Sequence, residues 1–207
     1  ESALVFCNQR ESVERVSNYL TEMGVDNEYF HGGMEQPERE RALSLFRNGS
    51  ASVFISTDLA SRGLDIPEVK NVIHYHLPIN EEAFIHRNGR TARMNAEGNA
   101  FMILNEIETV PEYITREPDE FFLPEKAKKP LRSEWVTLTI NRGKRDKLSK
   151  KDVVGFLFQK GGLDKDDLGV VEIKESCAYA AVKRDKKEGL LARIRDEKIK
   201  NMKAKFI

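Results

Sequence analysis

Hydrophobic and polar positions alternate along the first half of the chain in a way that predicts strands and helices in turn. Short segments that contain apolar or aromatic residues predict strands at 3–7, 27–30, 52–55, 69–75 and 99–104. Apolar residues spaced three and four apart predict helices at 11–23 and 36–48, and Asn80 is placed to cap a third helix. Strands that alternate with helices form a parallel sheet with helices on both faces, so an α/β domain is expected.

The pattern weakens after residue 106 and resumes after residue 132. A short helix at 109–115 and an edge strand at 121–123 are expected, followed by a proline- and lysine-rich stretch that is typical of a linker. Beyond the linker, strands are predicted at 135–141, 169–173, 177–182 and 200–206, with helices at 149–158 and 186–197. This βαββαβ order is typical of a small α+β module of the ferredoxin-like, RRM type. The predicted domains are therefore 1–124 and 133–207, joined by a linker at 125–132.

The charge of the chain divides between the same two parts. The formal net charge is zero, but residues 1–124 hold 11 basic and 21 acidic residues, whereas residues 125–207 hold 23 basic and 13 acidic residues. A basic second domain indicates a nucleic-acid partner, and a lysine-rich solvated surface is the alternative.

Several classes of protein are disfavoured by the sequence. It has no run of about 18 apolar residues and no secretory signal. We therefore expect a cytoplasmic location, with neither a membrane span nor a membrane partner. Cys7 and Cys177 lie in apolar runs, which predicts two buried thiols rather than a disulfide framework or a zinc site. His74 and His76 lie among strand residues without a carboxylate or thiol pattern, so they are interpreted as structural or interdomain residues and no metal site is predicted.

Two arginine-bearing stretches, thirty residues apart, carry the candidate chemistry. The first, S-T-D-L-A-S-R-G-L-D at 56–65, follows a predicted strand, and the second, H-R-N-G-R-T-A-R at 86–93, lies in the helix after another strand. In such folds ligands bind beyond the carboxyl ends of the strands. If the helix continues that far, His86, Arg90 and Arg93 share one face, where two guanidinium groups can hold phosphate oxygens. The chain has no G-x-x-x-x-G-K-[ST] loop to cradle phosphates and no pattern that would hold magnesium.

These two stretches resemble motifs V and VI of the DEAD-box RNA helicases. The run L-V-F-C-N at 4–8 resembles motif IV, and H-G-G at 31–33 with Q-P-E-R at 36–39 resembles motif IVa. The resemblance covers residues 1–124 and implies the second of two RecA-like domains. The phosphate loop and the D-E-A-D tetrad would then belong to an N-terminal RecA-like domain, which becomes an expected partner.

The resemblance also implies an ATP site shared with that domain. Arg90 and Arg93 would reach the γ-phosphate of ATP as arginine fingers, and His86 would communicate with the D-E-A-D strand. Asp65, in the stretch that holds Gly63, would contact the nucleotide. Mg²⁺ would be held by the N-terminal domain.

An RNA site is implied beside the ATP site. The family binds the sugar-phosphate backbone of one strand, and the matching positions here are Thr57, Gln36 and Arg39, with the backbone near Gly32. Such contacts position the strand without reading its sequence. Asn88 stands where the family usually has an apolar residue, and we expect it to face away from the arginines and to alter packing rather than chemistry.

The second domain carries a different candidate RNA surface. Its third predicted strand offers only Tyr179 for base stacking and has Glu175 where an RRM usually has Lys or Arg, so stacking on the sheet has little support. Positive charge gathers around Gly143 instead, in Arg142, Lys144, Arg145, Lys147, Lys150 and Lys151. With D-V-V-G at 152–155 and G-G-L at 161–163, this stretch resembles the RNA-binding domain of the DbpA subgroup. That subgroup recognises a hairpin in the peptidyl-transferase region of large-subunit ribosomal RNA.

One main hypothesis and two alternatives follow. The main hypothesis is the C-terminal portion of a monomeric ATP-dependent RNA helicase in ribosome biogenesis, a portion that binds RNA but hydrolyses no ATP by itself. The first alternative is a non-catalytic RNA-binding module. The second keeps the helicase but gives the basic domain a protein-docking role.

Overall fold

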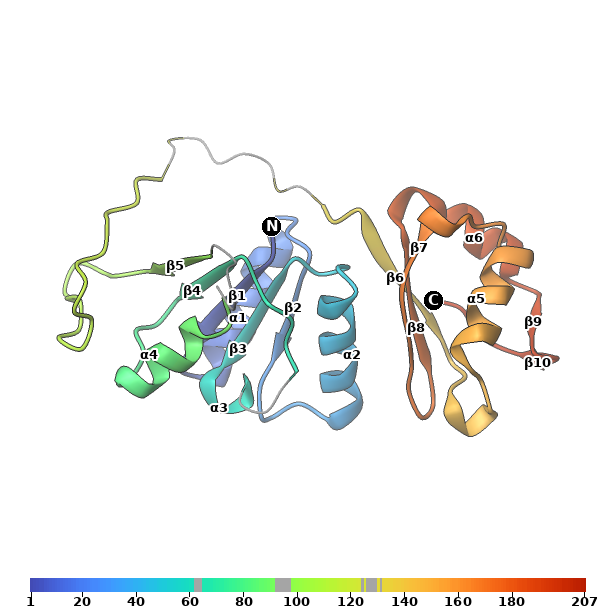
Figure 1. The fold of residues 1–207 in the computed structure, drawn as a ribbon, viewed down its shortest axis with the longest axis horizontal. Helices are drawn as coiled ribbons and strands as arrows, with labels where there is room; N and C mark the ends of the chain where they lie inside the picture. Colours follow the sequence, from blue (N-terminus) through green and yellow to red (C-terminus); the bar gives the residue numbers. More distant parts are fainter. Residues whose placement is uncertain (62–64, 92–97, 124, 126–129, 131) are drawn as a thin grey trace. The chain divides into compact units, whose positions relative to one another are not determined.

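The computed structural model describes residues 1–61, 65–91, 98–123, 125, 130 and 132–207, and it divides the chain into two compact units (Figure 1). Unit 1 comprises Glu1–Leu43 and Ser52–Arg132, and unit 2 comprises Ser133–Ile207 together with Ser44–Ala51. The main segment of unit 2 thus begins at Ser133. A separate linker at 125–132 stays a prediction.

A five-stranded parallel sheet forms the centre of unit 1. Its strands run in the order β2-β3-β1-β4-β5, with bounds β1 (Ala3–Cys7), β2 (Asn27–Phe30), β3 (Val53–Thr57), β4 (Asn71–His74) and β5 (Asn99–Met102). All five residues of β1 are buried, as expected for the middle strand of a sheet that is covered on both sides.

Helices cover both faces of this sheet, which confirms the α/β prediction. They are α1 (Arg10–Glu22), α2 (Gln36–Arg47), α3 (Asp58–Ser61) and α4 (Glu81–Asn88). Val13 of α1 packs on the face that carries Val5 and Ile55, whereas Arg87 of α4 lies over the ring of Phe6 on the opposite face. Figure 1 shows α1 behind the sheet and α4 in front of it.

At the C-terminal side of unit 1, one condition stated for the sequence is not met and one prediction was wrong. Helix α4 begins where Asn80 accepts a hydrogen bond from Ala83 N, but it ends at Asn88 with Gly89 as its C-cap, so it does not continue to residue 93. Residues 103–123 contain neither the predicted helix at 109–115 nor the strand at 121–123. Their aromatic side chains pack one at a time, Tyr113 near Phe84 and Phe121 against Phe101, instead of forming one apolar face.

Unit 2 is a three-stranded antiparallel sheet with two helices. Its sheet order is β6-β8-β7, with bounds β6 (Trp135–Ile140), β7 (Leu168–Ile173), β8 (Ala178–Lys183), α5 (Lys150–Gln159) and α6 (Lys187–Ile194), and short 3₁₀ turns η1 (Lys144–Asp146), η2 (Lys165–Asp167) and η3 (Arg184–Lys186). The core joins Leu138 and Ala180 of the sheet with Leu157 of α5 and Leu190 of α6. This arrangement agrees with the predicted small α+β module.

The predicted closing strand at 200–206 is divided in two. The strands β9 (Lys198–Ile199) and β10 (Met202–Lys203) pair as a hairpin. Lys200 and Asn201 have φ values of 52° and 62°, the left-handed values that a tight hairpin turn requires and a continuous strand forbids. The last residues then reach the edge of β6, where Thr139 and Ile207 exchange two backbone hydrogen bonds of 2.8 and 3.0 Å.

Candidate functional site

The carboxyl ends of three adjacent strands in unit 1 hold the candidate site. Asn8 follows β1, Asp58 follows β3 as the first residue of α3, and His76 follows β4. Because β3, β1 and β4 are neighbours in the parallel sheet, these residues gather at one edge. Arg87 and Arg90 reach this edge from α4 and the residues just after it.

Arg87 joins these elements through a fully buried guanidinium group. Its Nε and Nη2 atoms each donate to the Asp58 carboxylate at 2.6 Å. Nη2 also donates to Asn8 Oδ1 at 2.8 Å, and Nη1 donates to the His76 carbonyl at 2.7 Å. A buried charge is stable only when it is paired and hydrogen-bonded, so this set of contacts makes Arg87 an anchor of α4 rather than a ligand-binding group.

His74 and Asn88 extend the buried network behind Arg87. The His74 side chain is fully buried, its Nε2 lies 3.0 Å from Asn88 Oδ1, and its Nδ1 lies 3.4 Å from Arg87 Nη1. Burial lowers the pKa of His74 from 6.5 to about 4, so the ring is neutral at neutral pH. Asn88 therefore makes a polar contact in the interior, and its partner there is His74.

Arg90, in the second motif stretch, contacts Ser61 of the first stretch and His86 of its own. Its Nη2 donates to His86 Nε2 at 3.0 Å and to the Ser61 carbonyl at 3.4 Å. Arginine has no acceptor, so His86 must accept through an unprotonated Nε2, as a neutral ring does. The structure thus brings His86 and Arg90 together although the helix ends before Arg90.

Other predicted nucleotide residues are placed only in part. Arg93 and Gly63 lie outside the described residues. Asp65 is described and is exposed to solvent.

The predicted RNA residues of unit 1 gather near the turn after β2. Arg39 Nη2 donates to the Gly32 carbonyl at 2.7 Å, and its guanidinium lies 5.6 Å from the centre of the Phe30 ring. Gln36 donates to Glu40 on the same helix at 3.1 Å, and Thr57 ends β3. Arg39 and Gly32 are therefore in direct contact, as a shared RNA surface would need.

Arg10, at the start of α1, was missed by the sequence reasoning. A methyl group added at Gly32 would lie 3.3 Å from Arg10 Nη2, and one added at Gly33 would lie 3.4 Å from Arg10 Nη1. The exposed guanidinium of Arg10 therefore lies against the two glycines. The sequence did offer one sign of this contact, because Arg10 comes just after the stretch that resembles motif IV. That stretch ends β1, and only β3 separates β1 from β2 in the sheet.

The basic loop of unit 2 consists of residues 142–151, around η1 and the start of α5. Only glycine fits at 143, because a Cβ there would lie 2.7 Å from Cys177 N and closer still to the Lys174 carbonyl. Backbone bonds from Lys144 N to Lys174 O and from Arg145 N to Glu175 O hold the loop to the turn after β7. This rigid base leaves the basic side chains on its outside, where most are exposed.

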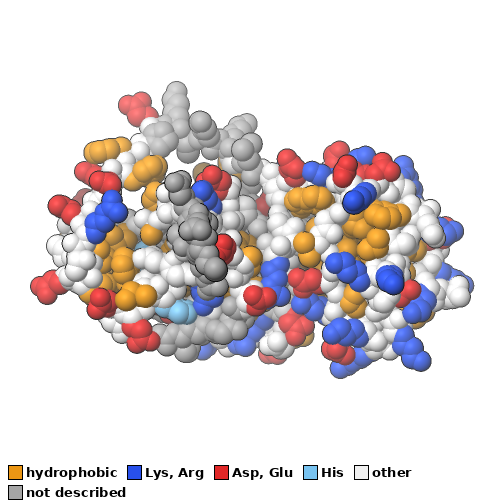
Figure 2. Space-filling model, in the orientation of Figure 1, with side chains coloured by type: hydrophobic (Ala, Val, Ile, Leu, Met, Phe, Trp, Pro, Cys, Tyr) orange, Lys and Arg blue, Asp and Glu red, His pale blue; other side chains and the backbone are white. Residues whose placement is uncertain are grey.

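Two of these cations have nearby carboxylates. Arg142 pairs with Asp146 at 3.7 Å, and Lys144 pairs with Glu175 at 3.8 Å. Both pairs are long and at least partly exposed to solvent, so they contribute little stability. Figure 2 shows lysine and arginine side chains spread over the visible face of unit 2.

Tyr179 lies on the sheet face that turns away from the helices of unit 2. Its neighbours Ala178 and Ala180 belong to the core, and side chains alternate along a strand, so Tyr179 projects from the opposite face. In register it stands between Thr139 and Glu172. It is therefore separate from the residues of the basic loop.

Two further observations limit the chemistry of the described residues. Within them, no cluster of histidine, cysteine, aspartate and glutamate could hold a metal ion. None of the helices formed by the described residues has the length and apolar character needed to cross a bilayer.

Comparison with known proteins agrees with these features. Residues 1–95 match the family model of the helicase conserved C-terminal domain, and residues 137–206 match that of the DbpA RNA binding domain. The ATP-dependent RNA helicase DbpA of Bacillus subtilis is 28% identical over 99% of this chain and 49% of its own length. The ATP-dependent RNA helicase DbpA of Escherichia coli is 34% identical over 88% of this chain and 41% of its own length.

Among solved structures, the E. coli DEAD-box protein SrmB matches with 38% identity and a TM-score of 0.47, over 49% of this chain and 59% of that chain. The chain spans less than half the length of the two curated DbpA relatives.

Proposed function

Because the chain belongs to the DbpA-like DEAD-box RNA helicases and matches their C-terminal region, we propose that it completes the ATP site of an RNA helicase and binds RNA at two surfaces. The observation that carries the proposal is the placement of Arg90. It follows a helix end that Arg87 anchors to the ends of three strands, and it is held against His86 and Ser61.

The ATP site would lie between unit 1 and an N-terminal RecA-like domain. Arg90 Nη2 contacts both His86 and the Ser61 carbonyl at the ends of the strands. A guanidinium is a planar, permanently charged group with five N–H donors, so its chemistry fits phosphate oxygens. We assign Arg90 and Arg93 to the γ-phosphate, with Asp65 and Gly63 at the nucleotide. Mg²⁺ would be supplied by the N-terminal domain, which also offers the D-E-A-D strand to His86.

The bonds of Arg90 explain how this chain would prepare the site. His86 and the Ser61 carbonyl restrict the side chain before ATP arrives, so little conformational entropy is lost when charge develops on the phosphate. Removal of an arginine finger of this kind lowers turnover by about 10³–10⁵.

The first RNA surface is in unit 1, at Gly32, Gln36, Arg39 and Thr57, and we add Arg10 to it. Arg10 and Arg39 place two guanidinium groups at the Gly32–Gly33 turn. Glycines at this turn let a sugar-phosphate backbone approach the protein backbone closely. Contacts of this kind hold the strand irrespective of its sequence.

The second RNA surface is the basic loop of unit 2. We propose that it targets the helicase to structured RNA of the large ribosomal subunit, and that the protein acts as a monomer in ribosome assembly in the cytoplasm. The rigid attachment of the loop at Gly143 supports recognition of a defined shape rather than of any polyanion.

Salt-dependent binding tests the proposal. The chain is titrated with fragments of large-subunit ribosomal RNA, and the logarithm of affinity is expected to fall with the logarithm of salt concentration by about 0.7 per phosphate contact. Replacing Lys147 and Lys150 with alanine should make that slope shallower by about 1.4. A salt response that stays flat, or unchanged affinity in this variant, would favour protein docking by unit 2 instead.

A turnover assay tests the shared ATP site. The chain alone should bind RNA and show no RNA-stimulated ATP hydrolysis, whereas the chain joined to its N-terminal domain should hydrolyse ATP. Activity that survives Arg90→Ala in the joined protein would contradict the assignment of Arg90.

A further inference from the structure

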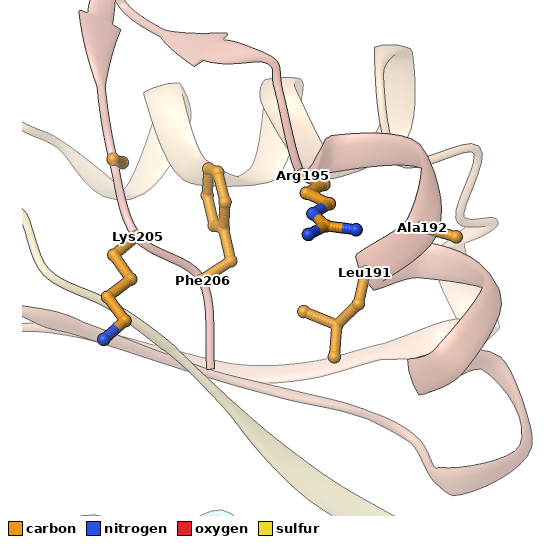
Figure 3. A pocket seen from close by; sticks show the side chains of 6 residues that line it. Leu191, Ala192, Arg195, Lys205 and Phe206 are labelled. Atoms are coloured by element: carbon orange, nitrogen blue, oxygen red, sulfur yellow. The ribbon is translucent and has the colours of Figure 1, made fainter.

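A cavity of about 490 Å³ lies within unit 2, between α6 and the C-terminal segment (Figure 3). Its volume falls in the range of about 300–1,000 Å³ that is common for small-ligand sites. It is lined by Leu191, Ala192, Arg195, Ala204, Lys205 and Phe206. We call this cavity the α6 pocket.

The floor of the α6 pocket is apolar and firmly supported. The Phe206 ring stacks on Phe156 of α5 with centroids 5.3 Å apart and planes 9° from parallel. Leu191 and Ala204 pack against the core of unit 2 beside it. A flat apolar group that entered the pocket would therefore meet a preformed surface.

The rim of the α6 pocket is cationic. Arg195 follows α6 directly and Lys205 belongs to the C-terminal segment, and both residues are exposed. Figure 3 shows the Arg195 side chain and Leu191 both pointing toward the segment that carries Phe206. Neither cation has an ion-pair partner in the part of the chain that the structure describes. An apolar floor with two cations at its edge suits a ligand that is both flat and anionic.

The α6 pocket is continuous with the basic loop. Lys205 N donates to Asn141 Oδ1 at 2.6 Å, and Asn141 N donates to the Lys205 carbonyl at 3.1 Å. Asn141 directly precedes the basic loop. On the hairpin of β9 and β10, Lys200 Nζ donates to the Lys147 carbonyl of that loop at 2.7 Å. The phosphate backbone of an RNA on the loop would therefore lie next to the rim of the pocket.

From these observations we propose that the α6 pocket binds one unpaired nucleotide beside the RNA structure held by the basic loop. The base would lie against Phe206 and Leu191, and its phosphate would contact Arg195, with Lys205 bridging toward the loop. Base stacking on an aromatic side chain and phosphate contact by arginine are the usual means of holding single-stranded RNA. The inference rests on the proposed RNA-binding function of unit 2.

The test compares a stem-loop RNA from large-subunit ribosomal RNA, with and without a single-stranded extension of about eight nucleotides. The chain carries Arg39→Ala throughout, so that the RNA surface of unit 1 contributes little. Extensions on the 5′ and 3′ sides are measured separately. We expect one of them to raise the affinity about tenfold.

Variants then separate the α6 pocket from the basic loop. Arg195→Ala should abolish the gain from the extension and leave the affinity for the plain stem-loop within about twofold. Lys165→Ala, which removes an exposed lysine in η2, is the matched control and should keep the gain. Lys147→Ala should weaken binding of both RNAs alike. Because Arg195 is exposed, its variant should fold normally.

Crosslinking identifies the contact itself. A 4-thiouridine placed in the extension should crosslink to the peptide that contains residues 203–207. The assignment of the α6 pocket would be overturned if the 4-thiouridine crosslinked only to other parts of the chain. It would also be overturned if Arg195→Ala kept the gain in affinity from the extension. Equal competition by an acidic peptide would overturn it as well, because the pocket would then be a protein-docking site.

The outcomes also distinguish this inference from the function on which it rests. A chain that binds the plain stem-loop but gains nothing from either extension overturns the α6 pocket alone. A chain that does not bind the stem-loop overturns the proposed function of unit 2 and the pocket with it.

Discussion

Acid should loosen unit 1 through His74, the fully buried histidine behind Arg87. Burial lowers its pKa from 6.5 to about 4, and the fixed charge of Arg87 acts in the same direction, while Asn88 and Asp58 act against it. Below pH 6.5 the unfolded chain takes up a proton at this position that the folded chain does not. Stability is therefore complete above pH 6.5 and is lost as the pH falls toward 4.

The magnitude follows from the size of the pKa shift. One pKa unit corresponds to about 1.4 kcal/mol, so the loss from His74 amounts to about 2 kcal/mol at pH 5 and about 3 kcal/mol at pH 4. His76 should add a smaller contribution of the same sign, because burial lowers its pKa too. Such a loss is a large share of the stability of an ordinary domain.

Hydrogen exchange measured by mass spectrometry is the appropriate assay. The single tryptophan, Trp135, lies in unit 2, so tryptophan fluorescence would report the wrong unit. Peptides that cover β1 and β4 report the opening free energy of unit 1 once the intrinsic pH dependence of exchange is removed.

The variant His74→Asn is neutral at every pH, and it should remove most of the fall in opening free energy between pH 7 and pH 4. Peptides of α5 and β8 serve as the internal control, because they belong to unit 2. The reasoning is refuted if the wild type and the variant lose the same opening free energy over this range.

Three further changes test other parts of the structure. Arg87→Met leaves the partly buried Asp58 without its partner and should cost unit 1 up to about 3–5 kcal/mol in the same exchange assay. The exposed Arg116→Met should cost almost nothing. Gly143→Ala forces a Cβ against the Lys174 carbonyl and should destabilise unit 2 by about 1–3 kcal/mol in urea unfolding followed by tryptophan fluorescence; an unchanged midpoint would contradict the fit at this glycine. Arg10→Ala should make the salt dependence of single-stranded RNA binding shallower by about 0.7, and an unaltered slope would remove Arg10 from the first RNA surface.

The sequence predicted the arrangement of unit 1 well because its signals are local. Each of the five strands is a short segment that contains apolar or aromatic residues, and α4 begins after Asn80, whose side chain caps it. Strand and helix alternation then requires parallel pairing, which places the residues after β1, β3 and β4 at one edge. The position of the candidate site could therefore be predicted from this edge of the sheet and from the arginines close to it in the sequence.

Predictions failed where local pattern was weak or ambiguous. At 109–115 the apolar residues are too few to form a helical face, and single aromatic contacts decide the path of the chain. At 200–206 the alternation of apolar and basic residues resembles a strand, but left-handed Lys200 and Asn201 turn the chain back on itself. A turn without glycine or proline gives little warning in the sequence.

The sequence by itself determined which residue types stand at the ends of the strands, and so the family and the chemistry available. Only the tertiary structure decided which of them are buried and paired. In the sequence, nothing distinguishes Arg87 from the other arginines of its motif. In the structure it is paired with Asp58 and Asn8, which lie 29 and 79 positions away along the chain. The charge of Arg87 and the neutrality of His74 depend on packing between such distant segments, and burial of that kind leaves no periodic trace along the chain.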